Sequence, residues 1–73
     1  MGRLGVLSGE EVCKILAKHG FKEMRRRGSH IVMQLKTEAS TVTVPVPDHK
    51  EIRKGTLQSI IRQSGIPKSE FEV

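Results

Sequence analysis

The 73-residue chain contains no tryptophan or tyrosine, two phenylalanines and one cysteine. Its core must therefore be built from valine, isoleucine and leucine. The single Cys13 excludes an internal disulfide and suits a reducing cytosol, and we interpret it as a small helix residue near the core rather than a reactive thiol. No apolar run is long enough for a transmembrane helix, and the N-terminus lacks the apolar segment of a secretory signal.

Acidic residues are in the minority. Thirteen lysines and arginines oppose eight aspartates and glutamates, which gives a net charge of +5. The bases gather in two places, residues 22–27 and 50–54. This balance favours a polyanion or an acidic protein as partner, although a solvated basic surface explains the charge alone equally well.

The length predicts one domain over residues 1–73. We interpret residues 1–6 as a leader or a short strand. Ser8-Gly9-Glu10-Glu11 fits a capping box, and the apolar residues that follow at helical spacing predict a helix over 9–19 that ends at Gly20. His19 falls on the apolar stripe of this helix, where packing and the helix dipole account for it.

Two strand-like segments, 21–27 and 30–36, flank Gly28-Ser29, a pair typical of a two-residue type II′ hairpin loop. This register places Arg27 opposite His30 and Met24 opposite Met33. Period-2 alternation then predicts an apolar and a polar sheet face, with Arg26 reaching out from the apolar side. The apolar face is expected to carry Met24, Ile31, Met33 and Leu35, and the polar face Glu23, Arg25, Arg27, His30 and Gln34.

Residues 41–46 predict a third strand, which Pro45 confines to a sheet edge because proline lacks a backbone donor. A second helix is expected to begin near Gly55-Thr56 and to end at Gly65, with Phe71 packing back from the tail. Its buried stripe is expected to be Leu57, Ile60 and Ile61. The predicted fold is α+β, in the order α-β-β-β-α, with two helices on one face of a three-stranded antiparallel sheet.

His30 is the histidine most suited to chemistry, with a purely structural role beside the turn as the alternative. An imidazole beside guanidinium groups on a solvated sheet face can transfer a proton during attack on a phosphodiester. We interpret His49 as an exposed loop residue, with a second catalytic role as the alternative. The histidines are not at ligand spacing and Cys13 stands alone, so neither a metal nor another cofactor is expected.

Five segments together carry a family resemblance: the helix from Ser8 to Gly20-Phe21, then Gly28-Ser29-His30, Val44-Pro45-Val46, Lys54-Gly55-Thr56-Leu57 and Ser64-Gly65-Ile66. In this order, over about residues 7–71, they resemble the HicA toxin family, also called YcfA-like. The resemblance implies a fold like that of the double-stranded-RNA-binding domain. It also implies a cytoplasmic toxin of a type II toxin–antitoxin system, an mRNA interferase that uses the histidine of the Gly-Ser-His turn, here His30.

We therefore expect a metal-independent endoribonuclease in which His30 takes the proton of a ribose 2′-OH, with His49, Lys54 or water as the acid. The expected RNA contacts are Arg25, Arg27, Ser29, Arg53 and Lys54. With so few aromatics, phosphate contacts, shape and 2′-OH recognition suit this chain better than base stacking.

The expected partners are mRNA and a HicB-type antitoxin that neutralises the toxin, with no membrane, and the free toxin is expected to be monomeric. Two alternatives stay open. One is a non-catalytic double-stranded-RNA-binding module, and the other is a protein-interaction domain whose basic face meets an acidic partner.

Overall fold

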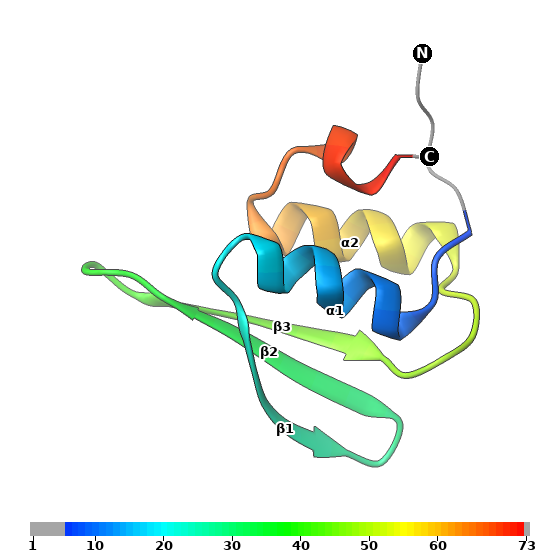
Figure 1. The fold of residues 1–73 in the computed structure, drawn as a ribbon, viewed down its shortest axis with the longest axis horizontal. Coiled ribbons are helices and arrows are strands. Elements are labelled where there is room, and N and C mark those ends of the chain that lie inside the picture. Colours follow the sequence, from blue (N-terminus) through cyan, green and yellow to red (C-terminus); the bar gives the residue numbers. More distant parts are fainter. Residues whose placement is uncertain (1–5, 73) are drawn as a thin grey trace.

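The computed structural model describes residues 6–72, in which two helices pack on a three-stranded sheet (Figure 1). The elements are α1 (Gly9–Lys18), β1 (Lys22–Arg27), β2 (His30–Lys36), β3 (Thr41–Pro47), α2 (Lys54–Ser64) and a short 3-10 helix, η1 (Lys68–Phe71). This order confirms the predicted α-β-β-β-α fold. Most of the proposed leader, residues 1–5, lies outside the described residues.

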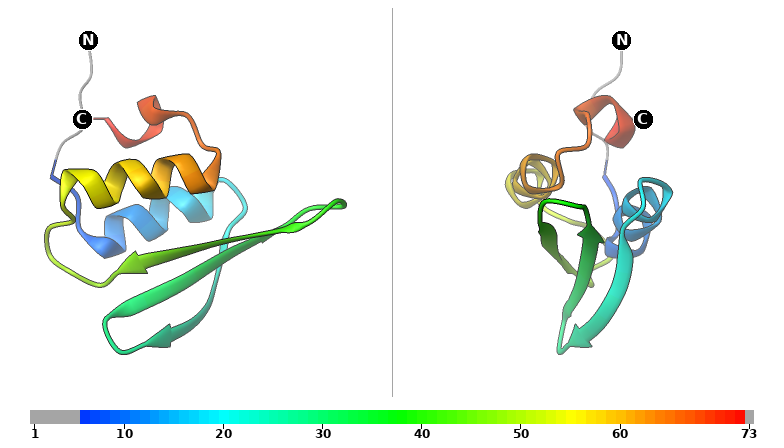
Figure 2. Two further views of the ribbon diagram at one scale, coloured as in Figure 1. Left: turned by 180° about the vertical axis from the view of Figure 1, so that it is seen from behind. Right: turned by 90° about the vertical axis from the view of Figure 1, so that its left-hand side faces the viewer.

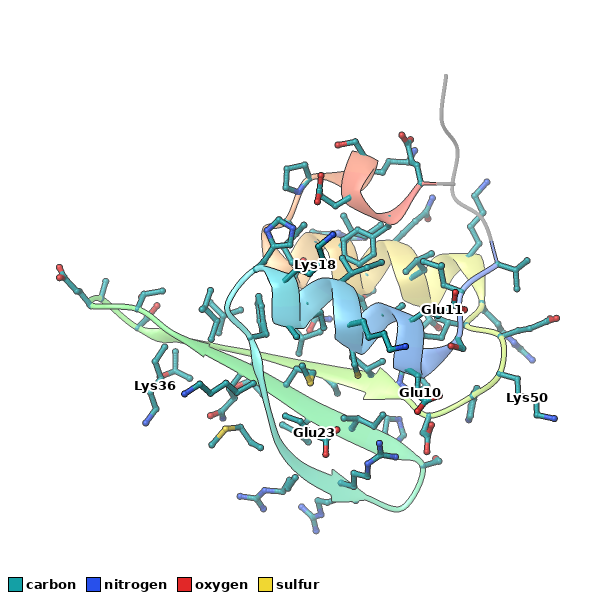
Figure 3. All side chains as sticks on the ribbon, in the orientation of Figure 1. Glu10, Glu11, Lys18, Glu23, Lys36 and Lys50 are labelled. Carbon is teal, nitrogen blue, oxygen red and sulfur yellow. The ribbon has the colours of Figure 1, made fainter. Side chains whose placement is uncertain are left out.

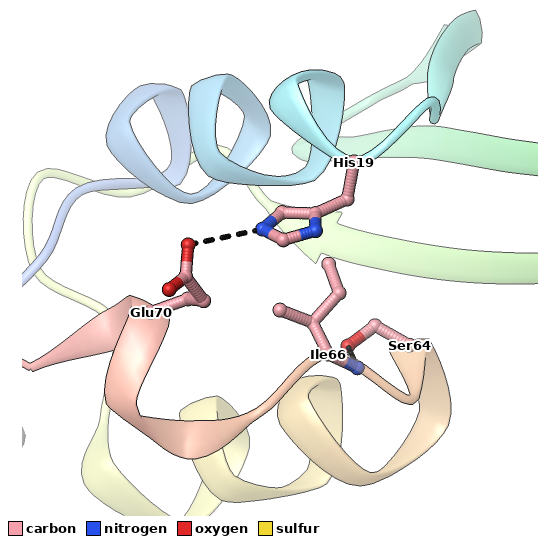
Figure 4. Close-up of polar contacts among 4 residues, drawn as sticks. All are labelled: His19, Ser64, Ile66 and Glu70. Atoms are coloured by element: carbon pink, nitrogen blue, oxygen red, sulfur yellow. Dashed lines mark hydrogen bonds and ion pairs between the residues drawn. The ribbon is translucent and has the colours of Figure 1, made fainter.

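The first helix begins at the predicted capping box. The Ser8 side chain accepts a hydrogen bond from the backbone N–H of Glu11 at 3.1 Å, and Glu11 Oε1 accepts one from the backbone N–H of Ser8 at 3.0 Å. The helix ends at Lys18, and His19 is its C-cap. His19 is only partly covered: its Nε2 lies 3.1 Å from Glu70 Oε1, so the residue links α1 to η1 (Figure 4).

The sheet is antiparallel, with β2 at its centre. Both helices lie on one face: α1 runs across all three strands and α2 packs chiefly on β3 (Figure 2). Between the layers, the largest fully buried side chains are Val12, Leu16, Ile31, Val44, Val46, Leu57 and Phe71. Within residues 6–72 no helix covers the opposite sheet face, which we call the open face.

The third strand and second helix agree with the sequence to within a residue. β3 is an edge strand, as Pro45 predicted, and Val44 and Val46 point into the core. Helix α2 ends at Gly65, whose φ of +73° is the left-handed conformation that glycine adopts most readily. Phe71, only 1% exposed, packs back from η1 as predicted.

One part of the predicted hairpin register is wrong. Arg27 pairs with His30 and Arg25 with Val32, but the register then shifts, and Glu23 rather than Met24 faces Met33. This β-bulge leaves Met24 and Arg25 together opposite Val32. Met24 therefore leaves the apolar face and is 51% exposed, whereas Glu23 moves to the helix side, where it lies 3.6 Å from Arg26. The predicted faces of Met24 and Glu23 are thus exchanged.

Candidate functional site

The β1–β2 turn has the geometry that its sequence predicts. Gly28 has a φ of +56°, and no non-glycine residue within residues 6–72 has a positive φ. Ser29 therefore keeps a negative φ, which a type II′ turn requires and a type I′ turn does not allow. The turn closes the hairpin so that His30, the first residue of β2, lies directly opposite Arg27.

The loop after β3 is fastened to this turn. Pro47 pairs with His30 across the sheet, and the backbone N–H of the next residue, Asp48, donates to the Ser29 carbonyl at 2.6 Å. The Asp48 carboxylate also accepts a hydrogen bond from Arg26 Nη1 at 3.0 Å. An exposed ion pair adds little to stability by itself. Together, however, the contacts fix the backbone on both sides of His30.

The N-terminus of α1 supports the same loop from the helix side. The Gly9 N–H donates to the His49 carbonyl at 2.9 Å, and the Ile52 N–H donates to the Leu7 carbonyl at 2.8 Å. A Cβ on Gly9 would overlap the Pro47 carbonyl oxygen. The loop therefore packs so closely on the start of α1 that only glycine fits at this position.

The structure brings Arg25, Arg27 and His30 together on the open face, as the sequence predicted. All three side chains are exposed, and Ser29 lies beside them at the turn. Among the described residues, the recorded ion pairs involve His19 and Arg26 but neither Arg25 nor Arg27. These two guanidinium groups are therefore available to an anion at the position of the imidazole.

Arg53 and Lys54 lie elsewhere. Arg53 is the N-cap of α2 and Lys54 is its first residue, so both belong to the helix layer, and both are exposed. The loop that contains His49 and Lys50 separates them from the open face. They share one end of the molecule with the β1–β2 turn, and Figure 3 shows Lys50 at this end and Lys36 at the other.

Sequence reasoning missed three parts of this site. It placed Met24 on the apolar face, and it gave no role to the Arg26–Asp48 contact. It also left Lys22 and Lys36 unassigned. These two lysines line one hollow of the open face together with Met24. The one available signal for Asp48 was its place directly after the strand that pairs with His30. The bulge at Met24 has no marker, because no glycine or proline stands there.

Cys13 packs against the core from α1. Burial raises the pKa of its thiol above the usual value, and the nearby Glu23 carboxylate raises it further. A raised pKa keeps the thiol protonated and unreactive at neutral pH. This agrees with its interpretation as a packing residue.

Two further features of the described residues bear on the site. No helix in residues 6–72 has the length and apolarity needed to cross a membrane. In the same range, no three histidine, cysteine, aspartate or glutamate side chains converge as ligands for a metal ion.

Comparison with known proteins gives a family. The model of the family described as HicA toxin of bacterial toxin-antitoxin systems matches residues 9–66. The chain belongs to the HicA toxin family. The match runs from the start of α1 past the end of α2, so it includes the hairpin, His30 and the loop fastened to it. Membership in HicA makes the chain a toxin component and implies an antitoxin partner. A search of curated proteins finds no match.

Proposed function

We propose that this HicA-family protein is an endoribonuclease that cleaves mRNA with His30 as its general base. The observation that carries the proposal is the exposed imidazole of His30, held opposite Arg27 on a hairpin whose tip is tied to the β3–α2 loop. A general base must reach its proton in a defined geometry. The contacts of Asp48 with Ser29 and Arg26 supply that definition.

The chemistry is transesterification. The imidazole of His30 takes the proton of a ribose 2′-OH, and the 2′-oxygen forms a bond to the adjacent phosphorus. The bond from phosphorus to the 5′-oxygen breaks, and a proton from the acid passes to that oxygen. Arg25 and Arg27 stabilise the charge that develops on the phosphoryl oxygens. The products carry a 2′,3′-cyclic phosphate and a 5′-hydroxyl.

The general acid comes from His49, Lys54 or water. His49 follows Asp48 directly, in the loop fastened to the turn. Lys54 starts α2 in the helix layer. Arg53 then contacts phosphates of the RNA that lie beyond the reacting bond, as does Lys54 where it is not the acid, and the Ser29 hydroxyl contacts the RNA at the turn.

The test is cleavage of RNA by the purified protein. We expect cleavage to continue in EDTA, because His30, the general acid and the arginines together perform each step without a metal ion. A 2′-deoxyribose at the cleavage position is expected to block the reaction, since it removes the nucleophile. Cutting of that deoxy substrate, or ends other than cyclic phosphate and 5′-hydroxyl, would contradict the mechanism.

The antitoxin partner is proposed to be a HicB-type protein whose acidic surface covers Arg25, Arg27 and His30. Opposite charge would speed the encounter, and contacts at the buried centre would provide most of the affinity. The Arg25→Glu, Arg27→Glu double variant is expected to lose the antitoxin in a pull-down. Undiminished binding in a complex that still cannot cleave RNA would place the antitoxin elsewhere. The free toxin is proposed to be a cytoplasmic monomer.

The second candidate function is binding of double-stranded RNA without catalysis. The α-β-β-β-α fold favours it, because the related RNA-binding domain has the same arrangement. A protein of this kind would shift duplex RNA in a gel and leave it uncut. Shortening of RNA that depends on His30 excludes it.

A further inference from the structure

The β-bulge places the side chain of Met24 on the open face, whereas strict alternation would have turned it toward the helices. Met24 and Arg25 both lie opposite Val32, and Met24 exposes 51% of its surface. Within residues 6–72 the one other large hydrophobic residue recorded as exposed is Val6, next to the start of α1. Met24 therefore takes no part in the core, and its side chain is available on the open face.

Met24 lies where two hollows of the open face meet. One, of about 320 Å³, is lined by Gly20, Lys22, Met24, Gln34 and Lys36. The other, of about 270 Å³, is lined by Met24, Arg25, Arg27, Val32 and Gln34. The two hollows adjoin at Met24 and Gln34, which line both, and together we call them the Met24 groove.

The charge of the Met24 groove has one sign. The groove is lined by Lys22, Lys36, Arg25 and Arg27, and by no acidic side chain of the described residues. The bulge contributes to this as well, because it turns Glu23 to the helix side, where the carboxylate meets Arg26. The groove therefore combines an apolar centre, Met24 with Val32, with cations along its length. Nucleic acid has this combination of flat apolar bases and a charged backbone.

The Met24 groove begins beside His30, the proposed catalytic residue, and extends away from it in one direction. Arg27, at one end, is paired with His30, and Lys36 lies at the other end, six positions further along β2. At about 3.3 Å per strand residue the groove extends roughly 20 Å from His30. An RNA strand lying in it would cover one side of the cleavage point only.

We propose that the Met24 groove holds a single-stranded segment of the RNA on one side of the bond cut at His30, with a base resting on Met24. A duplex hides the faces of its bases in the stack, whereas a single strand can present one to an apolar side chain. The methionine thioether contacts such a ring favourably and takes the place of the aromatic platform that this chain lacks. This inference rests on the proposed endoribonuclease activity.

The test is steady-state cleavage of single-stranded RNA by the full chain carrying Met24→Glu. A carboxylate at the groove centre removes the apolar contact and repels the backbone. We expect KM to rise about tenfold, the scale of losing one base contact, while kcat changes little. Met24→Leu keeps an apolar side chain and is expected to recover most of the wild-type KM. Val6→Glu adds the same charge at the other exposed hydrophobic residue and is the matched control, expected to keep the wild-type KM.

Oligonucleotides lengthened on one side of the cleavage point test the direction of the groove. For the wild type, lengthening on one side only is expected to lower KM, and Met24→Glu is expected to abolish that gain. Equal gains from both sides, or equal competition by duplex and single-stranded RNA, would overturn the proposal.

The failure of this inference can be told from failure of the proposed function. If the wild type cuts no RNA, the endoribonuclease proposal itself fails. If it cuts RNA and Met24→Glu keeps the wild-type KM, only the groove assignment fails. A variant with unchanged KM but weakened antitoxin binding would assign the Met24 groove to the antitoxin and likewise overturn the inference.

Discussion

The two faces of β2 are built from alternate residues of one strand, yet they differ in what they do. Ile31 and Met33 point to the helices and are 1% and 2% exposed. His30 and Val32 point to the open face, where His30 is exposed and Val32 half-buried. A small domain has little apolar surface to bury. In this chain the apolar side chains of β2 are buried chiefly on the helix-covered face. The open face is thereby free to hold charge beside a histidine.

The largest stability difference is expected between two neighbouring residues. Ile31→Ala removes a fully covered side chain and is expected to cost about 2–5 kcal/mol, whereas Val32→Ala is expected to cost well under half as much. In a domain of this size each kcal/mol lowers Tm by roughly 4–8 °C. Thermal melting followed by circular dichroism measures both. Equal losses of Tm in the two variants would mean that the open face contributes as much to stability as the helix-covered face.

Two glycines, Gly9 and Gly55, test whether the helix layer holds the loop that is bonded to the turn. Gly9→Ala is expected to destabilise by about 1–3 kcal/mol, because the added methyl group meets the Pro47 carbonyl. Gly55→Ala, in the first turn of α2 with nothing within 4 Å of the added carbon, is the matched control. It is expected to stabilise by about 0.4–1 kcal/mol.

Denaturant unfolding of both variants gives the sign of each change. A Gly9→Ala protein as stable as the wild type would show that the loop can move away from α1 at no cost. The contact between α1 and the loop would then not contribute to positioning His30.

On the open face, the arginines are expected to act through phosphate charge. In the non-cleaving His30→Ala background, replacing Arg25 or Arg27 with alanine should reduce the slope of log K against log salt by about one unit each. Arg62→Ala, on α2, removes the same charge from the helix layer and should leave the slope unchanged. Slopes unchanged in both open-face variants would place the RNA on another surface.

The smallest effect concerns Cys13. Because burial raises the pKa of its thiol, less thiolate is present at pH 8 than in an exposed cysteine. Alkylation by iodoacetamide should therefore be slower than that of glutathione at the same pH, and should approach it after denaturation. Rapid alkylation of the folded protein would show that the helix side is open near Glu23.

Local signals in the sequence were enough to predict most of the fold. The capping box at Ser8, the Gly28-Ser29 turn and the glycine after α2 each act over a few residues, and each stands where predicted. The arrangement of Arg25, Arg27 and His30 followed from the turn alone, because two-residue loops fix the register beside them. The predicted catalytic role of His30 stays a prediction.

The errors arose where the contacts that form follow no periodic pattern in the sequence. Alternation placed Met24 inside, but no residue of β1 is buried, so an apolar side chain gains little on either face of that strand. The bulge instead gives Glu23 a partner in Arg26. Similarly, the loop after β3 is held by Leu7, Gly9 and Ser29, and no periodic pattern records these pairings.

If the open face does the chemistry while the helix-covered face provides the stability, His30→Ala must remove the activity and leave the stability intact. Cleavage of a single-stranded RNA and the Tm are measured on one preparation, with His19→Ala, the histidine paired with Glu70 in the helix layer, as the control. We predict that His30→Ala loses about 10²–10⁴-fold in cleavage rate with an unchanged Tm, and that His19→Ala keeps the wild-type rate. A His30→Ala protein that cleaves at the wild-type rate would contradict the account.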